Sequence, residues 1–257
     1  MYLIVKREVA NIPLLEVARK DLFKEALPTV FFFHGVSSIK EQNLNYAYLL
    51  AEKNLRVVLP DANYHGERQK SVSNKEVTFN FWRIIIQSIY ELEKLKEVYI
   101  KEEKTLEDKI GVAGTSMGAI TTLGALSRYP WIRAAVSLMG SPSYGSFAKF
   151  LINQVKEQGE TLPFSEAEIE NEIQKLKPFD LSIHPEKLNN RPLLFWHGEK
   201  DDIVPIQFAK SFYEENYFRF KDSPEKFQLI VDKNAGHKVS IEGMKQCANW
   251  FDQFLNE

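Results

Sequence analysis

A serine between two glycines is the first group in this sequence that could do covalent chemistry. Ser116 lies between Gly114 and Gly118 in the stretch GVAGTSMGAI, residues 111–120. A serine hydroxyl is a weak nucleophile at neutral pH, so it needs a base, a group that orients the base, and donors for a developing oxyanion. The alternative interpretation is that these small residues only let a strand pack against a helix.

The residues around Ser116 have the pattern of a strand, a turn and a helix. Residues 109–114 (KIGVAG) predict a buried strand, and residues 117–130 predict a helix. The glycines remove side chains where the two backbones come close, which is the context that a G-x-S-x-G elbow needs to expose its serine. This arrangement also puts the Met117 amide at a helix N-terminus, where it can bind an oxyanion.

The base should be one of the five histidines. His237, in KNAGHKVS, lies on a polar loop between the last predicted strand and the last predicted helix. Loops that follow parallel strands gather at the carboxyl edge of the sheet, where Ser116 also lies, so we expect His237 to be the base. The other histidines are interpreted as structural hydrogen-bonding residues or have no evident partner: His34, His65, His184 and His197.

The orienting acid should lie between serine and histidine in the chain order Ser…Asp…His. The stretch WHGEKDDIVP offers Asp201 and Asp202, and either could also belong to a turn or a helix cap. Asp232, at the end of the next strand, is a weaker rival because it is so close in sequence to His237. A second oxyanion donor is expected at Val36, where the glycine of FFFHG lets the backbone turn.

The elements that must position these residues predict an α/β fold with a mostly parallel central sheet flanked by helices. Strands at 29–35 and 55–61, joined by a helix at 44–54, make a βαβ unit and imply a parallel sheet. The further predicted elements are a hairpin over 2–19, a long helix at 77–98, strands at 132–140, 191–198 and 226–232, and a final helix at 240–255.

Residues 141–190 are too long for an ordinary connection between a strand and the next element. Two helical patterns lie in this segment, and Ser165 and Glu168 form a capping box at the start of the second. We interpret the segment as a small helical cap inserted into a single domain that spans 1–257. Five residues of it could line an acyl pocket, although packing against the sheet is their more common role: Phe147, Phe150, Leu151, Val155 and Phe164.

Composition excludes several classes of function. The 257 residues carry a formal net charge of −2 spread along the chain, which gives no support for a nucleic-acid partner or an anionic membrane. The single cysteine, Cys247, leaves no internal disulfide and is interpreted as a packing residue. The N-terminal run is too short for a signal peptide, and no apolar run reaches the ~20 residues of a membrane helix, so we expect a soluble cytoplasmic protein.

These motifs resemble those of the α/β-hydrolase superfamily over nearly the whole chain. The matching pieces are HG after the first central strand, DANYHGER, GTSMG, HGEKDDIVP and AGH. They are most similar to bacterial esterases related to dienelactone hydrolases and to the prolyl-oligopeptidase catalytic domain. The resemblance selects Asp201 over Asp202 as the acid. It implies Ser116 as nucleophile, His237 as base, and the amides of Val36 and Met117 as the oxyanion hole.

The resemblance implies a serine esterase that works through an acyl-enzyme on a small-molecule ester, without metal or cofactor. Dienelactone hydrolases proper use a cysteine nucleophile, so the serine here argues against that particular activity. A serine peptidase, thioesterase or acyltransferase would use the same residues, and a non-catalytic ligand-binding protein of the same fold is a more distant alternative. A homodimer is left open.

Overall fold

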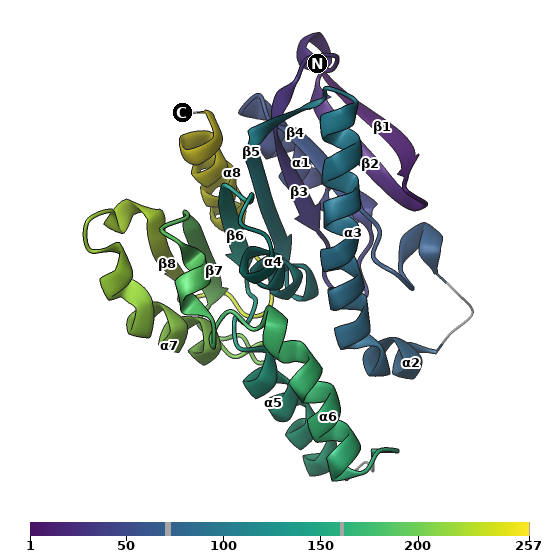
Figure 1. Ribbon diagram of the computed structural model, residues 1–257, viewed down its shortest axis with the longest axis vertical. Coiled ribbons are helices and arrows are strands. Elements are labelled where there is room, and N and C mark those ends of the chain that lie inside the picture. Colours follow the sequence, from purple (N-terminus) through teal and green to yellow (C-terminus); the bar gives the residue numbers. More distant parts are fainter. Residues whose placement is uncertain (70–72, 160–161, 257) are drawn as a thin grey trace.

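The computed structural model describes residues 1–69, 73–159 and 162–256, which form an eight-stranded sheet with helices on both faces (Figure 1). The strand order is β1-β2-β4-β3-β5-β6-β7-β8. β2 pairs antiparallel with β1 and with β4, and all other neighbours pair in parallel, so the predicted α/β sheet is confirmed. The strands are β1 (Tyr2–Val9), β2 (Ile12–Arg19), β3 (Leu27–Phe33), β4 (Arg56–Pro60), β5 (Thr105–Thr115), β6 (Ala134–Leu138), β7 (Leu193–Gly198) and β8 (Phe227–Asp232).

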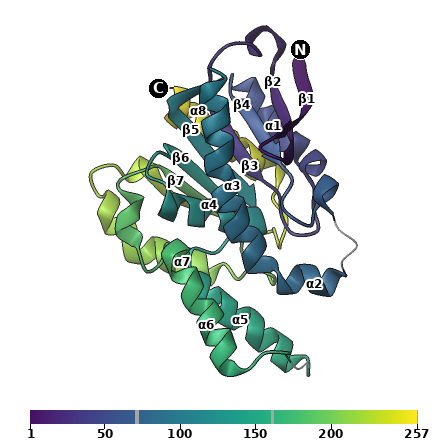
Figure 2. The ribbon, with the colours of Figure 1, turned by 45° about the vertical axis from the view of Figure 1, so that its right-hand side comes forward.

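Two helical layers enclose the sheet (Figures 1 and 2). One layer contains α3, α4 and α7, and the other contains α1 and α8. Because successive side chains of a strand point to opposite faces, β3 sends Phe31 and Phe33 into the first layer and Val30 and Phe32 into the second. This two-sided burial explains the unbroken apolar run of β3. The helices are α1 (Leu44–Glu52), α3 (Phe81–Lys101), α4 (Met117–Arg128), α7 (Gln207–Asn216) and α8 (Ile241–Asn256).

The β1–β2 hairpin closes through a two-residue turn at Ala10 and Asn11. Both residues have positive φ, 52° and 61°, which is the signature of a type I′ turn whose twist matches that of the strands. Val9 pairs directly with Ile12 across it. The predicted hairpin is therefore present with the expected boundaries.

The long helix predicted over 77–98 is wrong in one respect, because the chain forms two helices there. α2 (Asn74–Phe79) ends at Asn80, and α3 begins at Phe81. The Asn80 side chain donates from Nδ2 to the carbonyl of Glu76 at 2.8 Å, so it competes with the backbone for helical hydrogen bonds. A capping box between Ser73 and Glu76 starts α2, a signal that the apolar periodicity did not reveal.

The segment 141–190 forms α5 (Tyr144–Glu157) and α6 (Glu166–Leu176), which extend beyond the carboxyl ends of the parallel strands (Figures 1 and 2). The predicted capping box of Ser165 and Glu168 is present at the start of α6. Buried side chains anchor the base of this pair: Tyr144, Phe147 and Ala148 from α5, and Ile173 and Leu176 from α6.

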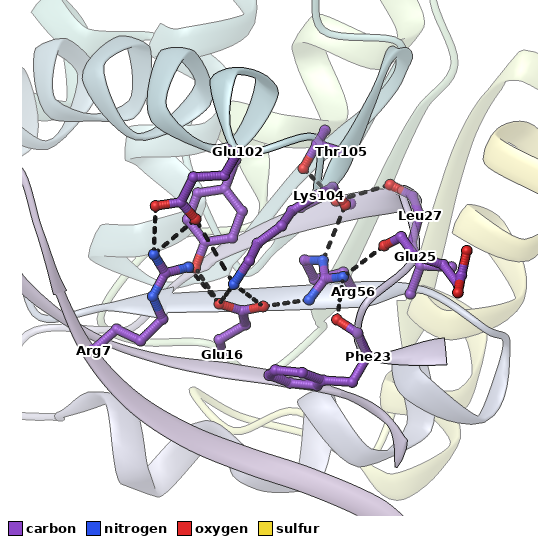
Figure 3. Close-up of polar contacts among 11 residues, drawn as sticks. Arg7, Glu16, Phe23, Glu25, Leu27, Arg56, Glu102, Lys104 and Thr105 are labelled. Atoms are coloured by element: carbon purple, nitrogen blue, oxygen red, sulfur yellow. Dashed lines mark hydrogen bonds and ion pairs between the residues drawn. The ribbon is translucent and has the colours of Figure 1, made fainter. Parts of the chain in front are cut away.

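A buried carboxylate ties the opposite, amino end of the sheet together (Figure 3). Glu16 of β2 is fully buried and forms an ion pair with Arg56, which is also fully buried. Its Oε2 also accepts from Arg7 at 2.7 Å and from the Tyr99 hydroxyl at 3.1 Å, and it lies 3.3 Å from Lys104 Nζ. One carboxylate thus links β1, β2, β4, α3 and the start of β5.

Candidate active site

Ser116 stands at the sharp turn between β5 and α4. Its φ is 53° and its ψ is −116°, a conformation that costs a non-glycine residue about 1–3 kcal/mol and persists only where the surroundings enforce it. Its amide donates to the Leu138 carbonyl at 3.0 Å, and its carbonyl accepts from Ile120 at 3.0 Å. These bonds fix the backbone, so the hydroxyl projects from a rigid turn rather than from a mobile loop.

The two glycines of the elbow are required by close backbone contacts. A Cβ on Gly118 would lie 2.1 Å from the Phe33 carbonyl oxygen, and a Cβ on Gly114 would lie 2.4 Å from the Gly118 carbonyl carbon. Both separations are far below van der Waals contact, so α4 could not pack this closely on β3 and β5 with any other residue. The glycines therefore do let the strand and the helix pack closely, and this packing is compatible with a serine hydroxyl that reaches His237.

The structure brings Ser116, His237 and Asp201 into one hydrogen-bonded chain. His237 Nε2 lies 2.8 Å from Ser116 Oγ, and His237 Nδ1 lies 2.8 and 2.9 Å from the two carboxylate oxygens of Asp201. An ionised carboxylate only accepts hydrogen bonds, so Nδ1 carries the proton and donates it. His237 Nε2 is then left with a lone pair that can accept the Ser116 hydroxyl proton.

Two loops that follow neighbouring strands bind each other and so place the acid beside the base. The amide of Lys200, in the β7–α7 loop, donates to the Ala235 carbonyl at 3.0 Å, and the amide of Glu199 donates to Asp232 at 2.9 Å. The loops touch so closely that a Cβ on Gly198 would lie 2.4 Å from the Gly236 carbonyl oxygen. Asp201 and His237, 36 residues apart, therefore meet through backbone contacts.

Asp201 is buried and well supplied with donors. Its Oδ1 accepts from the amides of Ile203 at 3.0 Å and Val204 at 2.9 Å, and its Oδ2 lies 3.3 Å from His197 Nε2. Burial by itself would raise the pKa of Asp201, but hydrogen bonds from His197, His237 and Val204 outweigh it and hold that pKa below its ordinary value. The carboxylate is therefore ionised at neutral pH.

The other acids considered from sequence lie apart from this chain of hydrogen bonds. Asp202 is exposed, although it is next to Asp201. Asp232 caps its own turn, where its Oδ1 accepts from the Asn234 amide at 3.0 Å. Of the two candidates that the spacing allowed, Asp201 is the one that contacts His237.

The remaining histidines make structural contacts. His34 donates from Nδ1 to the Gly35 carbonyl at 2.8 Å and accepts from the Ala62 amide at 3.0 Å, while burial lowers its pKa to about 4. His65 is buried and contacts the Asn63 carbonyl at 2.9 Å. His184 lies 3.5 Å from Glu186. His197 does contact the acid, so its interpretation as a structural hydrogen-bonding residue was incomplete.

The two amides expected at the oxyanion hole flank the serine turn. Met117 is the first residue of α4, where backbone N–H groups have no acceptor within the helix. Val36 follows Gly35, and a Cβ on Gly35 would be 3.4 Å from the Ser116 Cβ, so this turn passes directly beside the serine. No hydrogen bond from the Val36 amide to another described residue is present.

The apolar residues suggested for an acyl pocket differ in their surroundings. Phe147 is buried and contacts Phe150 and Phe208 at ring-centroid distances of 6.1 and 5.7 Å, so it packs the base of α5 against α7. Phe164 is half exposed and makes an edge contact with Phe79 at the end of α2. Leu151 and Val155 are partly buried on α5.

The described residues contain no group of three or more His, Cys, Asp or Glu side chains placed to hold a metal ion. Among the same residues, no helix combines the length and apolarity that crossing a membrane requires. Cys247 is a buried free thiol on α8, and burial raises its pKa well above the ordinary value.

A mostly parallel sheet with a serine at the β5–α4 elbow, an acid on the loop after β7 and a histidine on the loop after β8 defines the α/β-hydrolase class. Comparison with known families agrees. Residues 47–257 match the prolyl oligopeptidase family, and the chain belongs to that family. The predicted relationship to α/β-hydrolases of the esterase and oligopeptidase kind is confirmed.

Two full-length relatives support this assignment. The chain is 43% identical over 255 residues to the Bacillus subtilis (strain 168) protein named "Putative esterase YitV", covering 99% of this chain and 100% of that protein. It is 36% identical over 258 residues to "Esterase YjfP" of Escherichia coli (strain K12), covering 98% and 99% of the two chains. Among solved structures, TT1662 from Thermus thermophilus superposes with a TM-score of 0.77 at 18% identity, covering 100% and 99%, which supports the same fold.

Proposed function

We propose that this protein is a carboxylesterase that cleaves a small-molecule ester through an acyl-enzyme on Ser116. The observation that carries the proposal is the uninterrupted hydrogen-bonded chain from Ser116 Oγ through His237 to Asp201. This chain supplies the nucleophile, the base and the orienting acid that ester cleavage requires. The names of the two full-length relatives describe esterases, which supports the same activity here.

In the first step, His237 Nε2 takes the proton of Ser116 as Oγ attacks the ester carbonyl carbon. Asp201 holds His237 in the tautomer with a free Nε2 and stabilises the imidazolium that forms. The amides of Met117 and Val36 donate to the oxyanion of the tetrahedral intermediate. One such donor commonly contributes about 3 kcal/mol to transition-state stabilisation.

Collapse of this intermediate breaks the ester bond, and His237 gives its proton to the leaving alcohol oxygen. A water molecule, deprotonated by the same Nε2, then attacks the acyl-enzyme, and Ser116 regains its proton when the acid leaves. Every proton transfer in these reaction steps passes through His237, so the proposed mechanism needs neither a metal nor a cofactor.

We propose that the helices of residues 141–190 act as a cap that borders the acyl side of the site. Their base is anchored beside the carboxyl ends of the strands, and α5 carries apolar side chains there. We also propose the cytoplasm as the compartment, since the only cysteine is a buried thiol without a disulfide partner. The sequence supports neither a nucleic-acid partner nor a membrane partner.

A serine peptidase is the second candidate, favoured by the description of the matched family as prolyl oligopeptidases. A peptidase would use the same three residues and would differ in the leaving group that the pocket accepts. A thioesterase or an acyltransferase differs from an esterase in the same way.

Labelling with a fluorophosphonate probe tests the proposal. The wild-type protein should label on Ser116, and the Ser116→Ala and His237→Ala variants should not label. A panel of p-nitrophenyl esters, peptide p-nitroanilides and acyl thioesters then separates the activities. A folded wild-type protein that neither labels nor turns over any ester would refute the proposal and favour a ligand-binding role.

A further inference from the structure

His197 is a fully buried histidine that touches the proposed catalytic acid. It lies near the end of β7 and precedes Gly198, on which the His237 loop packs. Its Nε2 is 2.8 Å from the Val204 carbonyl oxygen and 3.3 Å from Asp201 Oδ2. The short contact is to the backbone, and the longer contact is to the carboxylate.

These contacts fix which ring nitrogen of His197 carries a hydrogen. A carbonyl oxygen can only accept, so Nε2 carries a hydrogen and donates it to Val204, with Asp201 Oδ2 3.3 Å from the same nitrogen. Nδ1 is buried and has no hydrogen-bond partner in the described part of the chain. The ring therefore contacts its neighbours through Nε2 alone.

We propose that His197 is a positioning residue for ester cleavage. It holds Oδ2 of Asp201 so that both carboxylate oxygens stay within hydrogen-bond distance of His237 Nδ1. The inference rests on the function proposed above. Oδ1 is held by two backbone amides, whereas Oδ2 has His197 as its partner besides His237. Without His197, one side of the carboxylate would be fixed and the other would depend on His237 alone.

Loss of this donor should also change the charge that His237 experiences. A hydrogen bond to a carboxylate stabilises its ionised form and draws charge away from its other partners. Removing it leaves more of the carboxylate's negative charge facing His237. The titratable side chains in contact with Asp201 are His197 and His237, while the flanking Lys200, Asp202 and Lys238 are exposed.

The test compares two variants of matched length, His197→Met and His197→Gln. Methionine has no donor, whereas the glutamine amide can place an N–H near the position of Nε2. We expect the methionine variant to lose about tenfold in kcat for a p-nitrophenyl ester, with KM little changed because His197 does not touch the substrate.

The glutamine variant should recover most of kcat. His184→Met, on a partly exposed histidine that contacts Glu186, is the matched control and should leave kcat and KM unchanged. A methionine variant that folds and keeps the wild-type kcat would overturn the proposal. Wild-type protein without esterase activity would instead overturn the function on which the proposal rests.

A measurement on the unmodified protein keeps the inference testable if the methionine variant does not fold. Nitrogen NMR of histidine-labelled wild-type protein should show one histidine whose hydrogen is on Nε2. This resonance is assigned to His197 by its absence in the glutamine variant. A hydrogen on Nδ1 of His197 in place of Nε2 would refute the proposed donor to Asp201.

Discussion

Glu16 offers the sharpest test of how this fold is stabilised, because one substitution would leave a cluster of cations without their shared carboxylate (Figure 3). In Glu16→Gln, the side chain keeps its size and loses its charge. Arg56 and Glu16 are both fully buried, so water cannot replace the lost interaction. Arg7 would keep only Glu102 as an acidic partner.

The size of the effect follows from what each cation retains. Breaking a buried ion pair by removing one partner costs about 3–5 kcal/mol, because the other charge stays buried. Arg56 would still donate to the carbonyls of Phe23, Glu25 and Lys104, which places the loss near the lower bound. We therefore expect Glu16→Gln to lose about 3 kcal/mol of unfolding free energy, or about 6–12 °C in Tm for a domain of this size.

The pH dependence gives a second readout of the same interaction. Burial alone would raise the pKa of Glu16, but the hydrogen bond from Arg7 and the charges of Arg56 and Lys104 lower it below the ordinary 4.5. A group whose folded-state pKa is lowered contributes stability that is fully present above its unfolded pKa. The stability gap between the wild type and Glu16→Gln should therefore be constant above about pH 5 and shrink as the pH falls further.

The assay is urea unfolding at several pH values, with Glu102→Gln as the control. Glu102 contacts the same Arg7 but is 35% exposed, so its loss should cost about 1 kcal/mol or less. Ester hydrolysis by folded Glu16→Gln should equal that of the wild type, because this cluster lies at the amino end of the sheet. A Glu16→Gln loss no larger than that of Glu102→Gln would refute the reasoning.

Three further outcomes are expected. Gly118→Ala should yield little folded protein or lower Tm strongly, because its Cβ would lie 2.1 Å from the Phe33 carbonyl oxygen; a wild-type Tm by calorimetry would contradict this packing argument. Asp201→Asn should fold but lose about 10⁴-fold in kcat, because the amide can favour the wrong tautomer of His237. Stopped-flow or steady-state ester hydrolysis would measure the loss, and a loss under tenfold would exclude Asp201 as the acid. Cys247, buried with a raised thiol pKa, should react with a maleimide only in denaturant; rapid labelling of the native protein would show that α8 opens.

Local patterns in the sequence were sufficient for the elbow and for most of the elements. Unbroken apolar runs predict buried strands, and apolar residues spaced three or four apart predict helices. The parallel strands and the serine turn therefore follow from residues that are close in the chain. The type I′ hairpin and the capping box of Ser165 and Glu168 are equally local. The break at Asn80 was not predicted because Val77 and Phe81 keep the helical i, i+4 spacing of apolar residues across it.

The choice between Asp201 and Asp202 shows what local patterns leave open. Two adjacent acids on one loop are equivalent by spacing, and only the resemblance to a known family separated them. In the structure, the backbone contacts between the β7–α7 and β8–α8 loops decide which carboxylate meets His237. That pairing depends on two strands being neighbours in the sheet.

Glu16 and His197 make the same point more strongly. In the sequence, Glu16 is one polar residue in an apolar strand, and His197 is one histidine before a glycine. Glu16 contacts Arg56 and Lys104, and Lys104 is 88 positions away in the chain. His197 contacts a loop carbonyl and Asp201. The sequence by itself determined where the chain could bend and which residues could react. Only the tertiary structure decided which buried charges are paired, because that depends on contacts between distant segments.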